Sequence, residues 1–207
     1  MDSRKVAVGR RERAKRDKRE RIMSAARELF ATNGVGGVTT QQVADRADGA
    51  IGTLYLYAST KAELLIMVQN QKFATAIDDG LAAASAVSGK APLEAVVALI
   101  RPVVICVREH AENGRTYLHE LVFGDPTEPY RREGLTLATR LEEGIAHLLD
   151  RDPAISSTDA ATLARVITAI IHISTTATIY LHRSDDDVIA DIREQVRATL
   201  ALRPRVA

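Results

Sequence analysis

The sequence predicts an all-α fold of about nine helices, in which an N-terminal three-helix unit precedes a larger helical unit. Apolar residues recur at spacings of three and four along most of the chain, which is the period of a helix with one face on a core. No stretch alternates strictly between apolar and polar residues, as a half-buried strand would. Within the first third of the chain, a tight turn separates two short helical segments.

The first helix is predicted from its apolar stripe and from the pair of residues that ends it. Asn33 and Gly34 both tolerate the left-handed backbone that terminates a helix. The stripe before them consists of Ile22, Ala25, Ala26, Leu29 and Phe30. We expect this face to cover a small core.

A short second helix is predicted to begin at Thr39. Its hydroxyl can accept a hydrogen bond from a free backbone amide, so Thr39 is a favourable N-cap. Val43 and Ala44 are expected to face the core, whereas Gln41 and Gln42 are expected to remain free on the outer face.

A turn at Asp48 and Gly49 separates this helix from a third, formed by residues 51–57. Asp48 tolerates the left-handed backbone that such a turn requires. Leu54 is the expected core contact of the third helix, and Lys61 begins a longer fourth one. Two short helices joined in this way aim the second of them into the major groove of DNA. We therefore expect this helix–turn–helix to bind double-stranded DNA.

The same residues resemble the DNA-binding signature of the tetracycline-repressor (TetR) family. The resemblance covers about a quarter of the chain, and its spacing is preserved from end to end. It implies a homodimer that binds a palindromic operator, is released by a small-molecule effector, and dimerises through its last two helices. The residues that carry it are Arg21, Ile22, Ala25, Ala26, Leu29, Phe30, Gly34, Thr39, Val43, Ala44, Ala47, Gly52, Thr53, Leu54, Tyr55, Tyr57, Lys61 and Leu64.

The turn departs from the family pattern. Asp48, Gly49, Ala50 and Ile51 stand where the family usually has glycine, valine, serine and a polar residue. Ala50 lacks a capping hydroxyl, a loss of about 1 kcal/mol. Ala58 replaces a usual aromatic residue, so we expect a less filled core beneath a locally loose recognition helix.

The DNA contacts are predicted from side-chain chemistry. Gln41, Ile51 and Leu56 are the expected base contacts, and Gly52 lies beside them. Because Ile51 and Leu56 can contact only thymine methyl groups, much of the specificity is expected from Gln41, Thr53 and DNA shape. Donors at helix starts or on the groove-facing helix are expected to hold phosphates. These donors are Thr39, Thr40, Thr53, Tyr55, Tyr57 and Lys61.

Charge supports a DNA-facing N-terminal end. The net charge is only +1, but residues 1–64 carry 13 basic and 8 acidic residues, against 15 and 19 in residues 65–207. We interpret residues 1–18 as a basic flexible arm that is either simply solvated or touches phosphates and the minor groove. Residues 19–63 are the predicted DNA-binding domain, and residues 64–207 the predicted effector-binding and dimerisation domain.

The later helices are predicted from their apolar stripes and from the glycine, proline and asparagine residues that separate them. Those expected span about 61–86, 93–112, 115–123, 127–149, 157–182 and 185–202, with Asn113–Gly114 ending the second. Pro102 lies inside that second helix and frees the Ala98 carbonyl, so a kink is expected. The last two helices carry long apolar stripes that suit a two-fold four-helix interface, and burial within one chain is the alternative.

An effector pocket is expected where three helices bear wider apolar faces than a small core needs. His172 and the freed Ala98 carbonyl would orient the guest, although a satisfied core histidine is the alternative. The low aromatic content favours an aliphatic or mixed guest. The predicted lining is Phe73, Ile77, Ile100, Val104, Tyr117, Leu121, Ile171, His172 and Thr175.

Catalysis finds little support in the sequence. It has no nucleophile elbow, phosphate-binding glycine loop or His-Glu-x-x-His pair, and we expect no catalytic site, metal or cofactor. Cys106 is expected to be a small buried hydrophobe, and His110 and His119 to be solvated. A small-molecule-binding enzyme or carrier, or a non-specific architectural DNA binder, is the alternative. With no apolar segment after the charged N-terminus and no run of roughly 20 apolar residues, we expect no membrane partner and a cytoplasmic location.

Overall fold

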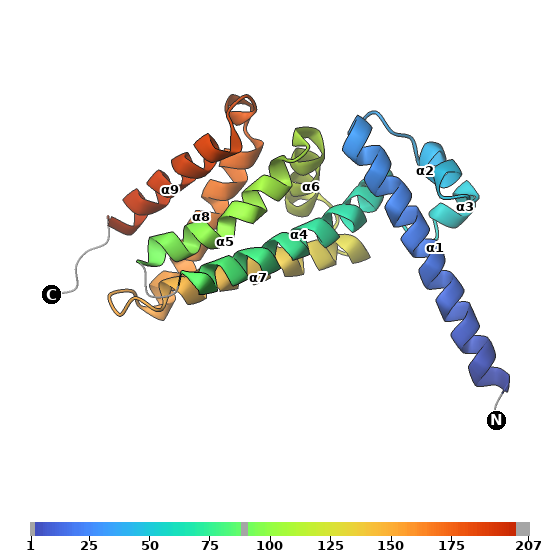
Figure 1. Ribbon diagram of the computed structural model, residues 1–207, viewed down its shortest axis with the longest axis horizontal. Helices are drawn as coiled ribbons and strands as arrows, with labels where there is room; N and C mark the ends of the chain where they lie inside the picture. The colour runs from blue at the N-terminus through green and yellow to red at the C-terminus, as the bar shows by residue number, and fades with distance from the viewer. Residues whose placement is uncertain (1–2, 88–90, 202–207) are drawn as a thin grey trace. The chain divides into compact units, whose positions relative to one another are not determined.

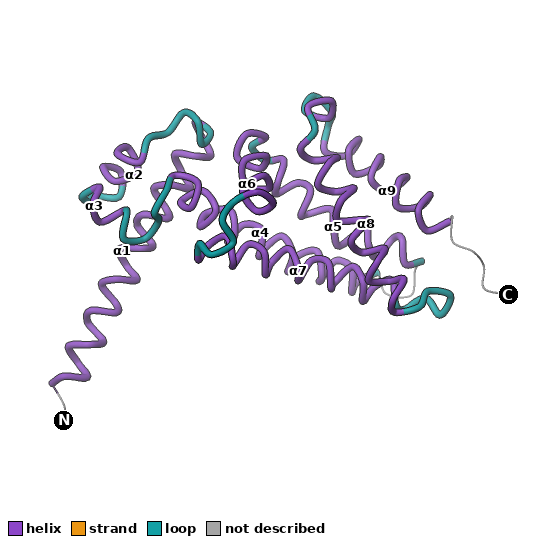
Figure 2. The backbone as a smooth tube through the Cα atoms, turned by 180° about the vertical axis from the view of Figure 1, so that it is seen from behind, coloured by secondary structure: helices purple, strands orange, loops and turns teal. Residues whose placement is uncertain are grey.

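The computed structural model describes residues 3–87 and 91–201, and it describes side chains from residue 12 onward. Helices joined by loops make up these residues, and none of them lies in a strand (Figure 2). The chain divides into two compact units, Met1–Val68 and Gln69–Ala207. The division falls inside helix α4 (Lys61–Ala86), five residues beyond the position expected from the sequence.

The first unit contains α1 (Ser3–Asn33), α2 (Thr40–Arg46), α3 (Ile51–Leu54) and the beginning of α4 (Figure 1). The expected flexible arm of residues 1–18 is instead the first half of α1 from Ser3 onward. The physical reason is composition, because the arginines, lysines, glutamates and alanines of this stretch all favour helix.

Four of the five residues of the predicted stripe on α1 are buried in the core of this unit, and the fifth, Leu29, is half-buried. Ile22, Ala26 and Phe30 are buried together with Val43 and Leu54 of the two short helices. Helix α1 ends where expected, since Gly34 follows it with a positive φ of 69°. The apolar period therefore locates both the helix and the face that it buries.

The second unit contains the rest of α4 and the helices that follow it. Helix α5 packs against α6, α7, α8 and α9, and α8 packs against α6, α7 and α9 (Figure 1). Most predicted boundaries hold to within two residues. The helices are α5 (Pro92–Arg108), α6 (Ala111–Phe123), α7 (Pro129–Leu149), α8 (Ser157–Thr176), the short 3₁₀ helix η1 (Thr178–Tyr180) and α9 (Asp185–Ala201).

The predicted break at Asn113–Gly114 is wrong, because both residues are buried within α6. The break lies at His110, whose Nδ1 accepts from the Asn113 amide at 3.5 Å and caps α6. Gly114 serves packing instead of helix termination. A Cβ atom there would lie 1.9 Å from the Val107 carbonyl oxygen, so only glycine lets α6 approach α5 this closely.

Helix α8 ends at Thr176 and not at the expected residue 182. The hydroxyls of Thr175 and Thr176 donate to the carbonyls of Ile171 and His172, respectively, at 2.7 and 2.6 Å. Such side-chain bonds compete with the backbone pattern of the helix. The apolar residues beyond Thr176 continue in η1 instead.

The glycine contact predicts a difference between two Gly→Ala substitutions. We expect Gly114→Ala to lower the free energy of unfolding by about 1–3 kcal/mol, because the methyl group must displace the Val107 backbone. Gly52→Ala is the matched control, since a Cβ at this helical glycine meets nothing within 4 Å. Chemical denaturation measures both. Equal stability of the two variants would contradict the close approach of α6 and α5.

Candidate functional site

Reciprocal hydrogen bonds fix the start of α2. The Gln42 amide donates to Thr39 Oγ1 at 3.2 Å, and the Thr39 amide donates to Gln42 Oε1 at 2.8 Å. This capping box confirms Thr39 as the N-cap. It also corrects the expectation that Gln42 is free on the outer face, because its side chain is spent on the cap.

The turn between α2 and α3 has the predicted backbone. Asp48 adopts a positive φ of 51°, which an aspartate tolerates better than most residues. The Gly49 amide donates to the Ala44 carbonyl at 3.0 Å, which closes the end of α2. Ala50 is the N-cap of α3 and makes no side-chain capping bond, as its lack of a hydroxyl predicts.

Helix α3 and the turn after it place two large side chains on the outside of the first unit. Leu54 is buried, whereas Tyr55 is 47% exposed and Leu56 is 83% exposed. The Tyr55 hydroxyl lies 3.3 Å from Thr40 Oγ1, so the end of α3 is linked to the start of α2. Among the other predicted contacts, Gly52 is exposed, and Ile51 and Thr53 are half-buried.

Two predicted phosphate donors already have partners within the first unit. The Tyr57 hydroxyl donates to the Lys15 carbonyl at 3.2 Å, and Lys61 Nζ donates to the Val38 carbonyl at 3.1 Å. A lysine ammonium has three donors, so Lys61 keeps two for a phosphate. These bonds orient both side chains before any DNA binds.

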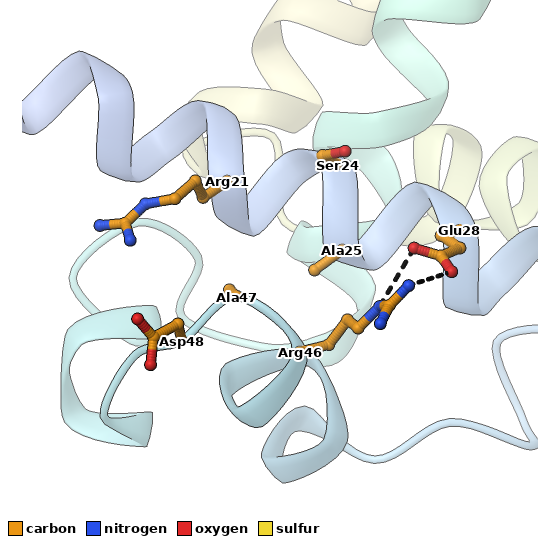
Figure 3. Close-up of a pocket in the computed structure, with 7 residues that line it drawn as sticks. All are labelled: Arg21, Ser24, Ala25, Glu28, Arg46, Ala47 and Asp48. Carbon is orange, nitrogen blue, oxygen red and sulfur yellow. Dashed lines mark hydrogen bonds and ion pairs between the residues drawn. The ribbon is translucent and has the colours of Figure 1, made fainter.

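A surface pocket of the first unit lies between α1 and the end of α2 (Figure 3). Arg46 crosses it and donates to both carboxylate oxygens of Glu28, at 3.1 and 2.5 Å. This carboxylate raises the pKa of the Arg46 guanidinium. The pair ties α2 to α1, and no local pattern predicts it because the partners are 18 residues apart. The pocket is lined by Arg21, Ser24, Ala25, Glu28, Arg46, Ala47 and Asp48.

The predicted effector residues of the second unit lie mainly in its packed core. Thr175 is buried with its hydroxyl bonded inside α8, so it offers no free polar group. His172 is half-buried, and burial lowers the pKa of its imidazole. The remaining members of the set are all buried, namely Phe73, Ile77, Ile100, Val104, Tyr117, Leu121 and Ile171.

A narrow cavity lies next to this core and has no room for a water molecule. Phe73 and Tyr117 of the predicted set border it, with their rings edge-on at a centroid distance of 5.7 Å. Burial raises the pKa of the Cys106 thiol to about 11. The cavity residues that sequence reasoning missed are Gln69, Cys106, Val107 and Gly114.

A buried polar chain adjoins this cavity. The Tyr117 hydroxyl donates to Asn70 Oδ1 at 3.0 Å, and Asn70 Nδ2 donates to the Tyr130 carbonyl at 2.7 Å. Burial raises the pKa of the Tyr117 phenol above its ordinary value. The chain connects α6, α4 and α7 at one point, where a Cβ on Gly134 would lie 2.8 Å from Asn70 Oδ1.

Within the described ranges, no three His, Cys, Asp or Glu side chains are grouped as metal ligands would be. The same residues include no helix that combines the length and the apolar character needed to cross a membrane.

Comparison with known proteins identifies the first unit. A family model described as bacterial regulatory proteins, tetR family, matches residues 22–68. The HTH-type transcriptional repressor KstR of Mycobacterium tuberculosis is 37% identical over 81 residues, which cover 39% of this chain and 36% of KstR. KstR of Mycolicibacterium smegmatis is 38% identical over 60 residues, 29% of each chain. The matches thus span about a third of the length of these curated relatives.

Solved structures share the fold over most of the chain. Thermus thermophilus FadR, a TetR family repressor in complex with lauroyl-CoA, has a TM-score of 0.68 at 20% identity, covering 91% of this chain and 98% of that one. Bacillus subtilis FadR in complex with stearoyl-CoA has a TM-score of 0.61 at 18% identity, covering 86% and 96%. At such identities the likeness concerns the fold alone. The matched residues hold the capped helix–turn–helix, so the first unit of this chain is similar to the DNA-binding part of the tetR family of bacterial regulatory proteins.

Proposed function

We propose that this protein is a dimeric, sequence-specific DNA-binding regulator that represses transcription from a palindromic operator and releases it when a small molecule binds. The observation that carries the proposal is the outer surface of α2 and α3. Leu56 lies in the turn directly after α3 and is 83% exposed, whereas Leu54, two residues earlier, is buried in the core. This motif presents α3 to the major groove. The family model of bacterial regulatory proteins matches residues 22–68, which include this surface.

The competing functions account for less of the structure. A carrier or enzyme on a helical scaffold would not explain why Tyr55 and Leu56 are exposed next to the capped helix α2. A non-specific DNA binder needs positive charge but no ordered base-contacting helix. A regulator of bacterial promoters works where the chromosome lies, so the proposal places this protein in the cytoplasm.

DNA binding is expected to use donors that the fold already orients. Thr39 and Thr40 stand at the start of α2, Tyr55 is held by Thr40, and Lys61 is held by the Val38 carbonyl. Backbone contacts of this kind fix the register on the duplex without selecting a sequence. Base selection is then left to Gln41, Ile51, Thr53 and Leu56.

The phosphate role of Lys61 predicts a change in salt dependence. Lys61→Ala should weaken binding to the protein's own upstream duplex, and the slope of log affinity against log salt should fall by about one. Tyr55→Phe should weaken binding without changing base preference. Lys72→Ala, which removes the same charge from the second unit, is the control in fluorescence anisotropy. A Lys61→Ala slope equal to that of the control would contradict the assignment.

We propose that the effector enters the second unit beside the narrow cavity at Phe73, Cys106 and Tyr117, and widens it. Phe73, Val107 and Tyr117 border the cavity, and the packed core beside it is largely aliphatic, which suits a guest with an apolar chain. Two structures of similar fold are complexes with lauroyl-CoA and stearoyl-CoA. Acyl-CoA thioesters are therefore the first class to test.

Filling this cavity should block the response. We expect lauroyl-CoA or stearoyl-CoA to raise the melting temperature of the protein and to release it from DNA. Cys106→Leu should weaken both effects about tenfold, because the larger side chain occupies the space, whereas the near-isosteric Cys106→Ser should keep them. Thermal shift and anisotropy measure the two effects. The absence of any shift with the wild-type protein would exclude this ligand class.

The dimer interface is proposed on the outward face of α8 and on η1. The apolar stripe of α9 is used inside the chain, since Val188, Ile192 and Val196 are buried in the single protomer. Helix α8 instead leaves Ile173 58% exposed, and Ile179 of η1 is 77% exposed. A two-fold contact through the last two helices therefore takes its apolar surface from α8 and η1, with the outer face of α9 beside it.

One charge in this surface should separate the protomers. Ile173→Glu buries a carboxylate at the proposed interface, at a cost of several kcal/mol, without touching the core. Val122→Glu is the matched control, because Val122 of α6 is 57% exposed. Light scattering should show a monomer for Ile173→Glu and a dimer for the control. The reverse result would move the interface to α6.

A further inference from the structure

A side-chain hydrogen bond on the outer face of α2 fixes the orientation of a predicted base contact. Gln41 Nε2 donates to Asp45 Oδ1 at 2.7 Å, one helical turn away, and both side chains are exposed. A carboxylate can only accept hydrogen bonds, so the Gln41 amide must turn its nitrogen toward Asp45. The amide oxygen and the second N–H are then left pointing away from Asp45.

The other polar side chains of α2 are occupied. Gln42 closes the capping box, Thr40 lies at hydrogen-bond distance from Tyr55, and Arg46 is bound to Glu28. Gln41 therefore remains as the side chain of α2 that offers an acceptor and a donor side by side. The hydrogen bond to Asp45 fixes the positions of the amide oxygen and of the remaining N–H of Gln41.

This pair of groups matches one base in the major groove. Adenine presents a donor at N6 beside an acceptor at N7, and a glutamine amide binds both at once. Guanine presents two acceptors, O6 and N7. An amide that turned over to suit another base would set its oxygen against the Asp45 carboxylate, acceptor against acceptor.

We propose that Asp45 is a positioning residue that holds Gln41 in the orientation that selects adenine in each operator half-site. The inference rests on the proposed DNA-binding function and adds to it the base that one residue selects. It also explains a negative charge on a DNA-facing surface, since Asp45 weakens binding to any phosphate backbone while it sharpens the choice of base.

Selection from randomised duplexes tests the proposal with four proteins, the wild type, Gln41→Ala, Asp45→Asn and Asp48→Asn. The wild type should enrich adenine at one position of each half-site, with a preference over guanine of roughly tenfold. Gln41→Ala identifies that position by losing the preference there. Asp45→Asn should reduce it to about twofold, because an amide at residue 45 accepts or donates and so permits both orientations of Gln41.

Asp48→Asn is the matched control. It removes the same charge from the same unit, and asparagine tolerates the positive φ of 51° at this turn position. Both Asn variants should bind random DNA more tightly than the wild type, but only Asp45→Asn should lose the adenine preference.

The outcomes distinguish a failure of the proposed role of Asp45 from a failure of the proposed DNA-binding function. If the wild type enriches no palindrome, the proposed function fails and the inference fails with it. If a palindrome is enriched but Gln41→Ala changes no position, or the position holds guanine, the inference alone is overturned. Full retention of the adenine preference by Asp45→Asn overturns it as well.

Discussion

The hydrogen bonds between Thr39 and Gln42 set the rotation of α2, and the DNA-binding unit depends on that rotation. A start shifted by one residue would turn the helix by about 100°. Val43 and Ala44 would leave the core, and Gln41 would leave the outer face. Arg46 would also lose Glu28, the contact that ties α2 to α1. The position of α3 follows in turn, because Asp48 and Gly49 begin the turn from the end of this helix.

In the second unit, the close packing of helices has the role that the capping box of α2 has in the first. Gly114 brings α6 against α5, and the Tyr117–Asn70–Tyr130 chain joins α6, α4 and α7 beside the narrow cavity. Asn70 lies two residues beyond Val68, the last residue of the first unit, on the same continuous helix α4. Phe73 of α4 and Tyr117 of α6 both border the cavity directly. In the proposed release of DNA, the continuous helix α4 therefore connects the ligand site to the helix–turn–helix.

Sequence reasoning succeeded where the determining interactions are local. The stripe on α1, the cap at Thr39 and the left-handed Asp48 all depend on residues within a few positions of one another. Sequence reasoning failed where a segment far away in the chain determines the role of a residue. Gly114 looked like a helix end because Val107 is not its sequence neighbour, and nothing local shows that α9 packs against α5 within one chain. The hydrogen bond from Gln41 to Asp45 is local but was not predicted, although its four-residue spacing is one that brings two side chains together on a helix.

The central claim is that two copies of this helix–turn–helix hold a two-fold symmetric DNA site. Hydroxyl-radical footprinting on a selected duplex tests it most directly, because it maps each backbone contact without assuming which residue makes it. We expect two protected half-sites related by a two-fold axis, with centres separated by one or more helical turns of about 10 base pairs. A single unsymmetric footprint, or protection that does not depend on sequence, would contradict it.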